Sequence, residues 1–157
     1  MVRPVVHALR VRCRASRLEL WPYVADTELL NQVAGSARIE VLPASEPKGA
    51  ARFAMTTRMG GVTVAYDEEP FSFAVGRSFS WTRASARGPT KRITGRYELA
   101  DLDGGTEVTA TFTTEPRSFV FKPIVWLVQG ARARGVARYI RLVDDALVAR
   151  RPVRLVA

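Results

Sequence analysis

The chain has 157 residues, the size of a single domain, and its content of 47% hydrophobic and 25% charged residues is that of an ordinary globular protein. One cysteine and one histidine exclude an internal disulfide framework, a multi-cysteine zinc site and a metal centre built from histidines. The chain contains no run of 18 apolar residues, so we expect no transmembrane helix, and its arginine-rich start is unlike a secretory signal peptide. We therefore expect a soluble, cytoplasmic, single-domain protein.

The net charge of +9 is concentrated at the two ends of the chain. Residues 1–17 carry a charge of +5, residues 18–116 carry −3, and residues 117–157 carry +7. A basic excess of this kind permits contact with nucleic acid, an anionic membrane or an acidic protein, and does not choose among them.

The first third of the chain predicts a strand and two short helices. Residues 5–13 alternate in polarity as a strand does. Ser16 and Glu19 have the spacing of a capping box, so a short helix should follow and reach about residue 24. A second short helix is expected over 27–34, with Asp26 as its N-cap and Gly35 as its stop.

From residue 37 to residue 113 the pattern has period two, which predicts strands. Gly60-Gly61 and Asp103-Gly104-Gly105 are hairpin signals. One face of each strand is apolar, which is typical of an antiparallel sheet covered on one side. The expected strands are centred on 39–41, 53–59, 62–66, 71–82, 93–99 and 108–113.

The last element is a long helix from about residue 118 to residue 148. Apolar residues at helical spacing form one stripe from Phe121 through Val128 and Tyr139 to Ala146, and Arg132 falls inside that stripe. Arg134, Arg138 and Arg141 lie on another face, where Arg141 is four residues before Asp145 and suitably placed to pair with it. The expected architecture is α+β, with the final helix packed in the concave face of a curved antiparallel sheet of about six or seven strands.

This order of elements, together with the segment Trp21–Glu28, resembles the helix-grip fold of the START-like (SRPBCC) superfamily, which includes polyketide cyclases, lipid-transfer proteins and plant hormone-binding proteins. Residues 30–35, 58–62 and 68–71 look like the START-like domains that precede bacterial adenylate/guanylate cyclase domains. None of the cyclase's own metal-binding residues has a counterpart here. We expect a START-like domain over residues 1–149, and residues 150–157 as a tail or the start of a linker to a further domain.

The resemblance implies an elongated apolar cavity between the sheet and the long helix. The alternative is a solid core, because aromatic residues at strand spacing usually pack against one another. Gly76, Gly95, Gly130 and Gly135 favour the cavity, since glycine removes packing volume. The expected ligand-binding residues are Phe53, Met55, Tyr66, Phe79, Trp81, Tyr97, Phe112, Val128, Arg132 and Tyr139.

A charge on an apolar helix face must find a partner or water, because burying it alone costs several kcal/mol. Arg132 would therefore anchor a carboxylate or phosphate of a hydrophobic ligand through its guanidinium fork, or else pair with an acid of the sheet or extend to solvent. Arg134, Arg138 and Arg141 form a solvated face, a docking surface for a neighbouring domain or protein, or a nucleic-acid contact. We do not expect nucleic acid, because no aromatic residues are interleaved with these arginines.

Three further features have ordinary structural explanations. His7, Tyr66 or Tyr97 would serve a cyclase-type reaction as proton donors, although a lone histidine near an edge is usually structural. The acidic run 67–69 is typical of a solvated corner rather than a metal site, and Cys13 of a buried small hydrophobe.

The predicted function is non-catalytic binding of a lipid-like or polyketide-like molecule, without cofactor or metal. By its resemblance, the domain would be the sensory part of a nucleotide cyclase that signals to a downstream domain through its basic C-terminal helix. The alternatives are a polyketide cyclase or aromatase acting on a poly-β-keto substrate, in which a tyrosine or arginine polarises a carbonyl, and a basic module that binds nucleic acid or an anionic membrane.

Overall fold

The computed structural model describes residues 2–26, 29–30, 40–42, 53–59, 62–69 and 71–153, with the backbone alone for 40–42, 53–59 and 62–64. The helical elements are α1 (Arg17–Val24), the single 3-10 turn η1 (Phe119–Phe121) and α3 (Lys122–Val148). The strands are β1 (Val5–Cys13), β2 (Glu40–Leu42), β3 (Phe53–Met59), β4 (Val62–Glu68), β5 (Ser72–Ala74), β6 (Ser78–Ala84), β7 (Thr90–Leu102) and β8 (Gly105–Pro116).

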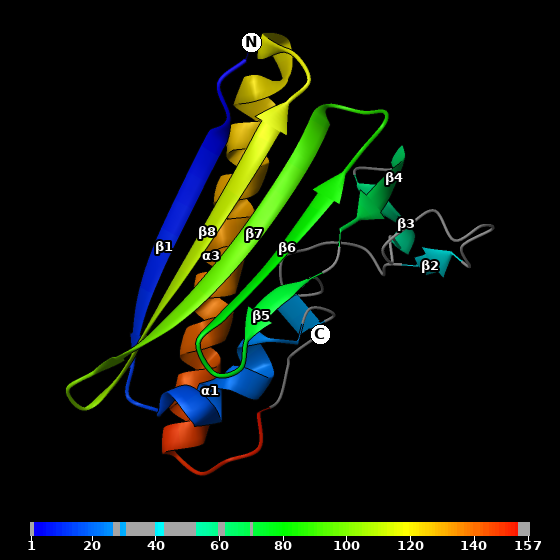
Figure 1. Ribbon diagram of the computed structural model, residues 1–157. Coiled ribbons are helices and arrows are strands. Elements are labelled where there is room, and N and C mark those ends of the chain that lie inside the picture. The colour runs from blue at the N-terminus through cyan, green and yellow to red at the C-terminus, as the bar shows by residue number, and fades with distance from the viewer. Residues whose placement is uncertain are drawn as a thin grey trace.

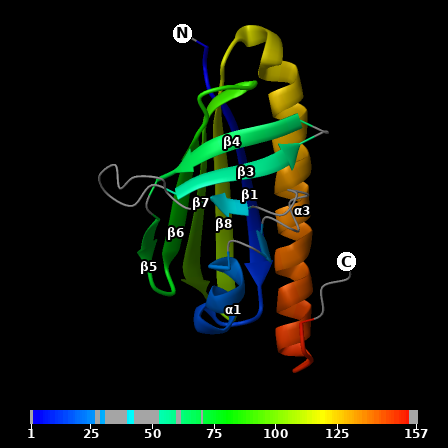
Figure 2. The same ribbon diagram turned by 90° about the vertical axis from the view of Figure 1, so that its right-hand side faces the viewer.

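The strands form one antiparallel sheet that curves along the long helix (Figure 1). Their order is β1-β8-β7-β6-β4-β3-β2, and β5 pairs with β6 beside this path. The α3 helix runs along the concave side and packs chiefly against β1 and β8 (Figure 2). The predicted α+β helix-grip architecture is confirmed.

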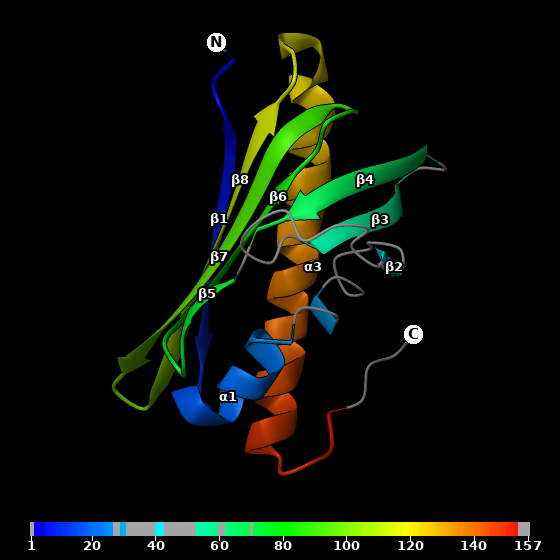
Figure 3. The same ribbon diagram turned by 45° about the vertical axis from the view of Figure 1, so that its right-hand side comes forward.

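The hairpin of β3 and β4 leaves the plane of the other strands (Figure 3). It is joined to β6 at only two register positions, Asp67 opposite Ala84 and Glu68 opposite Arg83. Residues 78–80 of β6 pair with the short β5 instead. The sheet therefore bends sharply between β6 and β4 (Figure 3).

The inner face of the sheet supplies the core. Alternate residues of β8 are buried, and Val108, Ala110 and Phe112 are completely shielded from water. Cys13 at the end of β1 is buried among them, as predicted, and burial raises the pKa of its thiol to about 11. Its thiol is therefore an apolar packing group at neutral pH.

Local signals at the start of the chain are also confirmed. Ser16 accepts the backbone N–H of Glu19, and the Glu19 carboxylate accepts the backbone N–H of Ser16, which is the predicted capping box. The side chain of Asp26 accepts the backbone N–H of Leu29, so Asp26 caps a further turn as predicted. Apart from residues 29 and 30, the second predicted helix lies outside the described residues.

The expected strand over residues 71–82 is wrong in one respect. The chain reverses direction at residues 75–77, where Gly76 has a φ of +69°, and β5 folds back on β6 with Phe73 opposite Phe79. Only glycine adopts this left-handed conformation without a steric cost. Period two continues through this turn, so polarity alone gave no sign of the reversal.

The buried face of α3 also differs from the predicted stripe. Val125, Val136 and Ile140 are buried against the sheet, whereas Ile124 and Val128 of the predicted stripe are exposed. The reason is that the buried stripe includes two polar residues, Gln129 and Asp144, while the start of the helix is apolar on both faces. The sequence pattern counted only apolar residues, and it therefore placed the centre of the buried helix face at the wrong position around the helix axis.

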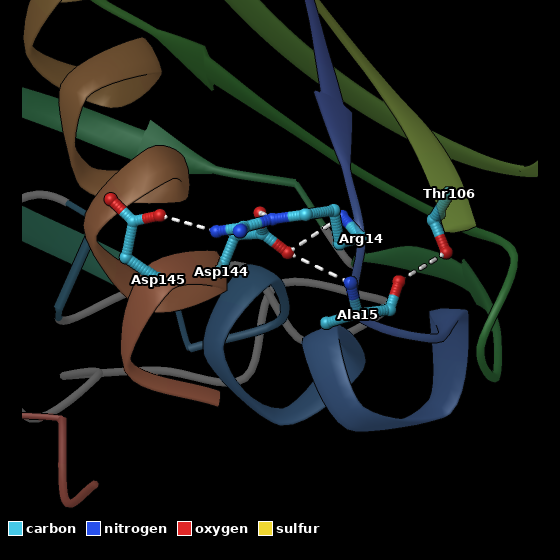
Figure 4. Close-up of polar contacts among 5 residues, drawn as sticks. All are labelled: Arg14, Ala15, Thr106, Asp144 and Asp145. Carbon is cyan, nitrogen blue, oxygen red and sulfur yellow. Dashed lines mark hydrogen bonds and ion pairs between the residues drawn. The ribbon is translucent and has the colours of Figure 1, made fainter. Parts of the chain in front are cut away.

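A buried carboxylate joins the end of α3 to the junction of β1 and α1 (Figure 4). One oxygen of Asp144 accepts the backbone N–H groups of Arg14 and Ala15, both at 2.8 Å. The carbonyl of Ala15 in turn accepts the hydroxyl of Thr106 at 2.9 Å. The helix dipole disfavours acidic residues near a helix C-terminus. The two hydrogen bonds from the N–H groups of the junction offset this effect at Asp144.

Asp144→Ala should lower the free energy of unfolding by about 2–4 kcal/mol, because it leaves two backbone N–H groups without an acceptor. Asp145→Ala is the matched control, since Asp145 is exposed and pairs with the exposed Arg14 guanidinium at 2.6 Å. Its cost should be at most about 1 kcal/mol. Urea unfolding measures both values, and equal losses would contradict the role of Asp144.

Candidate functional site

Aromatic rings line the inner face of the sheet on strands β6, β7 and β8. The rings of Phe79 and Tyr97 stack with their centroids 6.2 Å apart, and Tyr97 meets Phe112 edge to face at 5.8 Å. Phe71 adds a fourth ring at 5.4 Å from Phe79. Phe79, Tyr97 and Phe112 project from inward positions of the neighbouring strands β6, β7 and β8, and Phe71 precedes β5 and is partly exposed.

Trp81 belongs to β6, and its indole lies over Gly95 of the neighbouring strand β7. A Cβ atom at Gly95 would be only 2.5–2.7 Å from three atoms of the Trp81 indole. The register places Gly95 directly opposite Trp81 on one side and Phe112 on the other. The space that this glycine leaves is therefore filled by Trp81, and is not part of an open cavity.

Arg132 projects from α3 onto these rings. Its guanidinium carbon is 4.9 Å from the Trp81 ring centroid and 5.4 Å from that of Phe112, both within cation–π range. Desolvation lowers the pKa of the Arg132 guanidinium, and Tyr97 opposes this effect. A guanidinium nevertheless keeps its proton at neutral pH. The site therefore holds a cation against an aromatic surface.

A second arginine approaches the same tryptophan. The Arg83 guanidinium carbon is 4.5 Å from the Trp81 centroid, and its Nε donates to Glu68 Oε1 at 2.8 Å. Both side chains are buried, so the expectation of a solvated acidic corner is wrong for Glu68. Glu69 pairs with Arg92 at 2.8 Å. In the described part of the chain, no group of acidic, histidine or cysteine residues is arranged to hold a metal ion.

Two tyrosines complete the cluster. Burial raises the pKa of Tyr97 to about 12, which the nearby charges of Arg132 and Arg83 only partly offset. Burial raises the pKa of Tyr66 as well. Both phenols therefore keep their protons at neutral pH, and a protonated phenol is a hydrogen-bond donor.

The structure brings most of the predicted ligand-binding residues together. Tyr139 is buried on the same face of α3, but its hydroxyl donates to the carbonyl of Tyr23 at 3.3 Å. Val128 is 42% exposed and is not among the buried residues of α3. The backbone register places Phe53 opposite Glu68 and Met55 opposite Tyr66, and the side chains of Phe53 and Met55 lie outside what the structure describes. The cluster contains Tyr66, Phe79, Trp81, Tyr97, Phe112 and Arg132.

Sequence reasoning missed three polar members of this interior. Arg83 follows Phe79 and Trp81 with period two, so strand parity would have placed it inward. Glu68 follows Tyr66 in the same way. Gln129 is one turn before Arg132 and donates to the hydroxyl of Thr114 at 2.6 Å, a contact that no local pattern indicates.

The other candidate residues lie outside the cluster. The His7 ring packs against Trp126, with centroids 5.6 Å apart, in a groove of about 350 Å³ between β1 and α3. Arg134, Arg138 and Arg141 are exposed on α3, and the latter two line a groove of about 700 Å³ with Arg151. Asp145 pairs with Arg14, where we expected Arg141.

Comparison with known proteins assigns the family. Residues 9–150 match the model of the family described as "Polyketide cyclase / dehydrase and lipid transport". The chain belongs to this family. Its members share the helix-grip fold of the START-like superfamily that the order of elements indicated. No curated protein matches the chain.

Solved structures with the same fold have low sequence identity to the chain. The Zhui aromatase/cyclase from Streptomyces sp. R1128 is 12% identical, with a TM-score of 0.70 and coverage of 93% of this chain and 96% of that one. The di-domain aromatase/cyclase StfQ of the steffimycin biosynthetic pathway is 12% identical, with a TM-score of 0.69 and coverage of 94% and 52%. A START superfamily protein from Mycobacterium smegmatis is 14% identical, with a TM-score of 0.64 and coverage of 90% and 98%.

Gly95→Ala should destabilise the protein by about 1–3 kcal/mol, because its methyl group and the Trp81 indole cannot occupy the same space. Gly130→Ala is the control, since a Cβ there would meet the His7 ring at an ordinary 3.4 Å and alanine favours a helix. Urea unfolding with tryptophan near-UV circular dichroism measures both. Wild-type stability of Gly95→Ala would show that the indole does not lie on Gly95.

The raised pKa of Tyr97 predicts a loss of stability in alkali. The phenol has a pKa of about 12 when folded, above its ordinary value of 10, so its stabilising effect is complete below pH 10 and declines as the pH approaches 12. Between about pH 9 and about pH 11 this amounts to about 1 kcal/mol. Tyr97→Phe should remove that part of the decline in urea unfolding, and an unchanged decline would exclude Tyr97 as a source.

Proposed function

We propose that the domain binds a hydrophobic small molecule, lipid-like or polyketide-like, against the inner face of the sheet beside α3. The observation that carries this proposal is the guanidinium of Arg132, held over Trp81 and Phe112 within an aromatic surface. Ligand sites are mostly apolar with a few placed polar groups, and this arrangement has that composition.

The polar groups define which ligand fits. Arg132 offers donors to a carboxylate, phosphate or carbonyl oxygen, and Tyr66 and Tyr97 are neutral phenols that donate as well. Every one of these groups favours an acceptor on the ligand. The ligand class is therefore an apolar body with at least one oxygen acceptor, preferably anionic.

The first experiment is native mass spectrometry of the purified protein, followed by solvent extraction and identification of any bound compound. A stoichiometric hydrophobic adduct would support the proposal and name the ligand. A mass without adduct, together with no binding of dodecanoate or dodecanol in calorimetry, would favour a solid core.

Arg132→Met should weaken binding of dodecanoate about tenfold or more and leave dodecanol affinity much less affected, because only the carboxylate gains from the guanidinium. Arg96→Met is the matched control, since Arg96 is an exposed arginine that pairs with Glu98 on the outer face of β7. Calorimetric titration of both ligands measures the difference. Equal dodecanoate affinity in Arg132→Met and the wild type would remove Arg132 from the site.

The second candidate is a polyketide cyclase or aromatase. It is favoured by the combination of Arg132 with the neutral Tyr97, since a guanidinium and a phenol suit the polarisation of a carbonyl during ring closure. Turnover of a poly-β-keto thioester that is lost in Tyr97→Phe and in Arg132→Met would support an enzyme. Binding of the same compound without turnover would support a binding domain.

The sensory role in a nucleotide cyclase stays a prediction from the resemblance of residues 30–35, 58–62 and 68–71. The C-terminal end of α3 would transmit ligand binding to a following domain, because Asp144 connects this end to the junction of β1 and α1. If a cyclase domain follows in the gene, its rate of cyclic nucleotide formation should respond to the ligand in the wild type and lose that response in Arg132→Met.

A further inference from the structure

Large apolar side chains are exposed where the long helix begins. Phe119 and Val120 in η1 are 77% and 66% exposed, and Ile124 and Leu127 in the first turns of α3 are 57% and 59% exposed. Single exposed apolar residues are ordinary, but a contiguous group of them marks an interaction surface. We call this group the apolar tip; it consists of Phe119, Val120, Phe121, Ile124, Leu127 and Val128.

The charged residues of α3 before Asp144 are all basic. Residues 117–143 contain six basic residues and no acidic residue, and one of the six, Arg132, lies in the interior. Lys122 lies within the tip, and Arg134, Arg138 and Arg141 continue the outer face of α3 beyond it, because they follow Leu127 at helical spacing. The exposed Arg3 belongs to the N-terminal segment, which lies at the same end of the molecule (Figures 1 and 2).

We propose that the apolar tip and the arginines behind it dock on the surface of an anionic lipid bilayer. The apolar side chains would enter the boundary between headgroups and acyl chains, and the arginines would meet the headgroup phosphates. In the described part of the chain no helix is long and apolar enough to cross a membrane, so this contact lies on the surface. The proposal does not depend on the interior ligand site.

Other occupants fit the observations less well. A second copy of the chain would bring two surfaces of the same positive sign together. Nucleic acid would use the arginines but gives no role to exposed valine, isoleucine and leucine side chains. An anionic bilayer accounts for both the apolar and the basic half of the face.

The surface is also preorganised. The inner face of α3 is packed on β1 and β8, and its end is fixed by Asp144, so the helix exists before any membrane contact. An isolated amphipathic peptide must first fold on the bilayer and loses affinity by doing so. Here binding requires ordering of exposed side chains only.

The test is flotation of the full chain with vesicles of phosphatidylcholine alone and with about 30% phosphatidylglycerol. We expect binding to the anionic vesicles, little to the neutral ones, and a decrease as salt rises from about 0.1 M to about 0.5 M. Quenching of the exposed Trp126 by brominated acyl chains should report its proximity to the bilayer.

Phe119→Ser with Val120→Ser should weaken vesicle binding about tenfold or more. The matched control is Phe73→Ser with Val75→Ser, which removes two equally exposed apolar side chains at the β5 turn, away from the tip (Figure 1). Arg134→Gln with Arg138→Gln should weaken binding by a similar factor. The control is Arg77→Gln with Arg96→Gln, at the β5–β6 turn and on the outer face of β7, which lowers the net charge equally. Circular dichroism checks that every variant is folded.

Three results would overturn the proposal. The first is no binding of the wild type to anionic vesicles. The second is equal loss of binding in the tip variants and their controls, which would indicate general adhesion. The third is a dimer in light scattering that Phe119→Ser with Val120→Ser dissociates, which would assign the tip to self-association.

Discussion

The position of the long helix on the sheet depends on the carboxylate of Asp144, which accepts two backbone N–H groups at the junction of β1 and α1. Arg132 is twelve residues, or about 18 Å, before this anchor on a rigid rod. A shift of one residue in the anchor would rotate every side chain by about 100° and turn Arg132 away from Trp81. The hydrogen bond between Gln129 and Thr114 fixes the same rotation one turn before Arg132. The site is thus set by contacts that lie outside it.

The interior combines two arginines with a series of aromatic rings, and the electrostatic attraction between them would be weaker in contact with water. The Glu68 carboxylate neutralises one guanidinium, and the faces of Trp81 and Phe112 stabilise the other. Gly95 makes this possible, because any side chain there would displace the indole on which both guanidinium groups lie. Apolar walls strengthen these attractions, since the effective dielectric constant is lower than in water.

Much of the fold was predictable because strands and caps are local. Period two in β6, β7 and β8 and the capping box of Ser16 and Glu19 each depend on a few neighbouring residues. The buried face of α3 was not predictable, because Gln129 and Asp144 are buried by partners distant in the sequence, while the apolar Ile124 and Val128 remain exposed. Within the site, the alternation of inward and outward residues along each strand correctly placed Trp81 and Tyr97 inward. The pairing of Glu68 with Arg83 required the bend between β4 and β6, which no pattern indicates.

The pairing of β1 with β8 has a consequence for the order of folding. Every residue of β1 has its sheet partner about a hundred residues later, and Arg14 meets Asp144 across 130 positions. During synthesis the first strand must wait, without a partner in the sheet, until β8 and then α3 have left the ribosome. Closure of such distant contacts is slow, so we expect a late, cooperative folding step in which the first and last elements join. Chaperones that shield nascent chains would act on β1 in that interval.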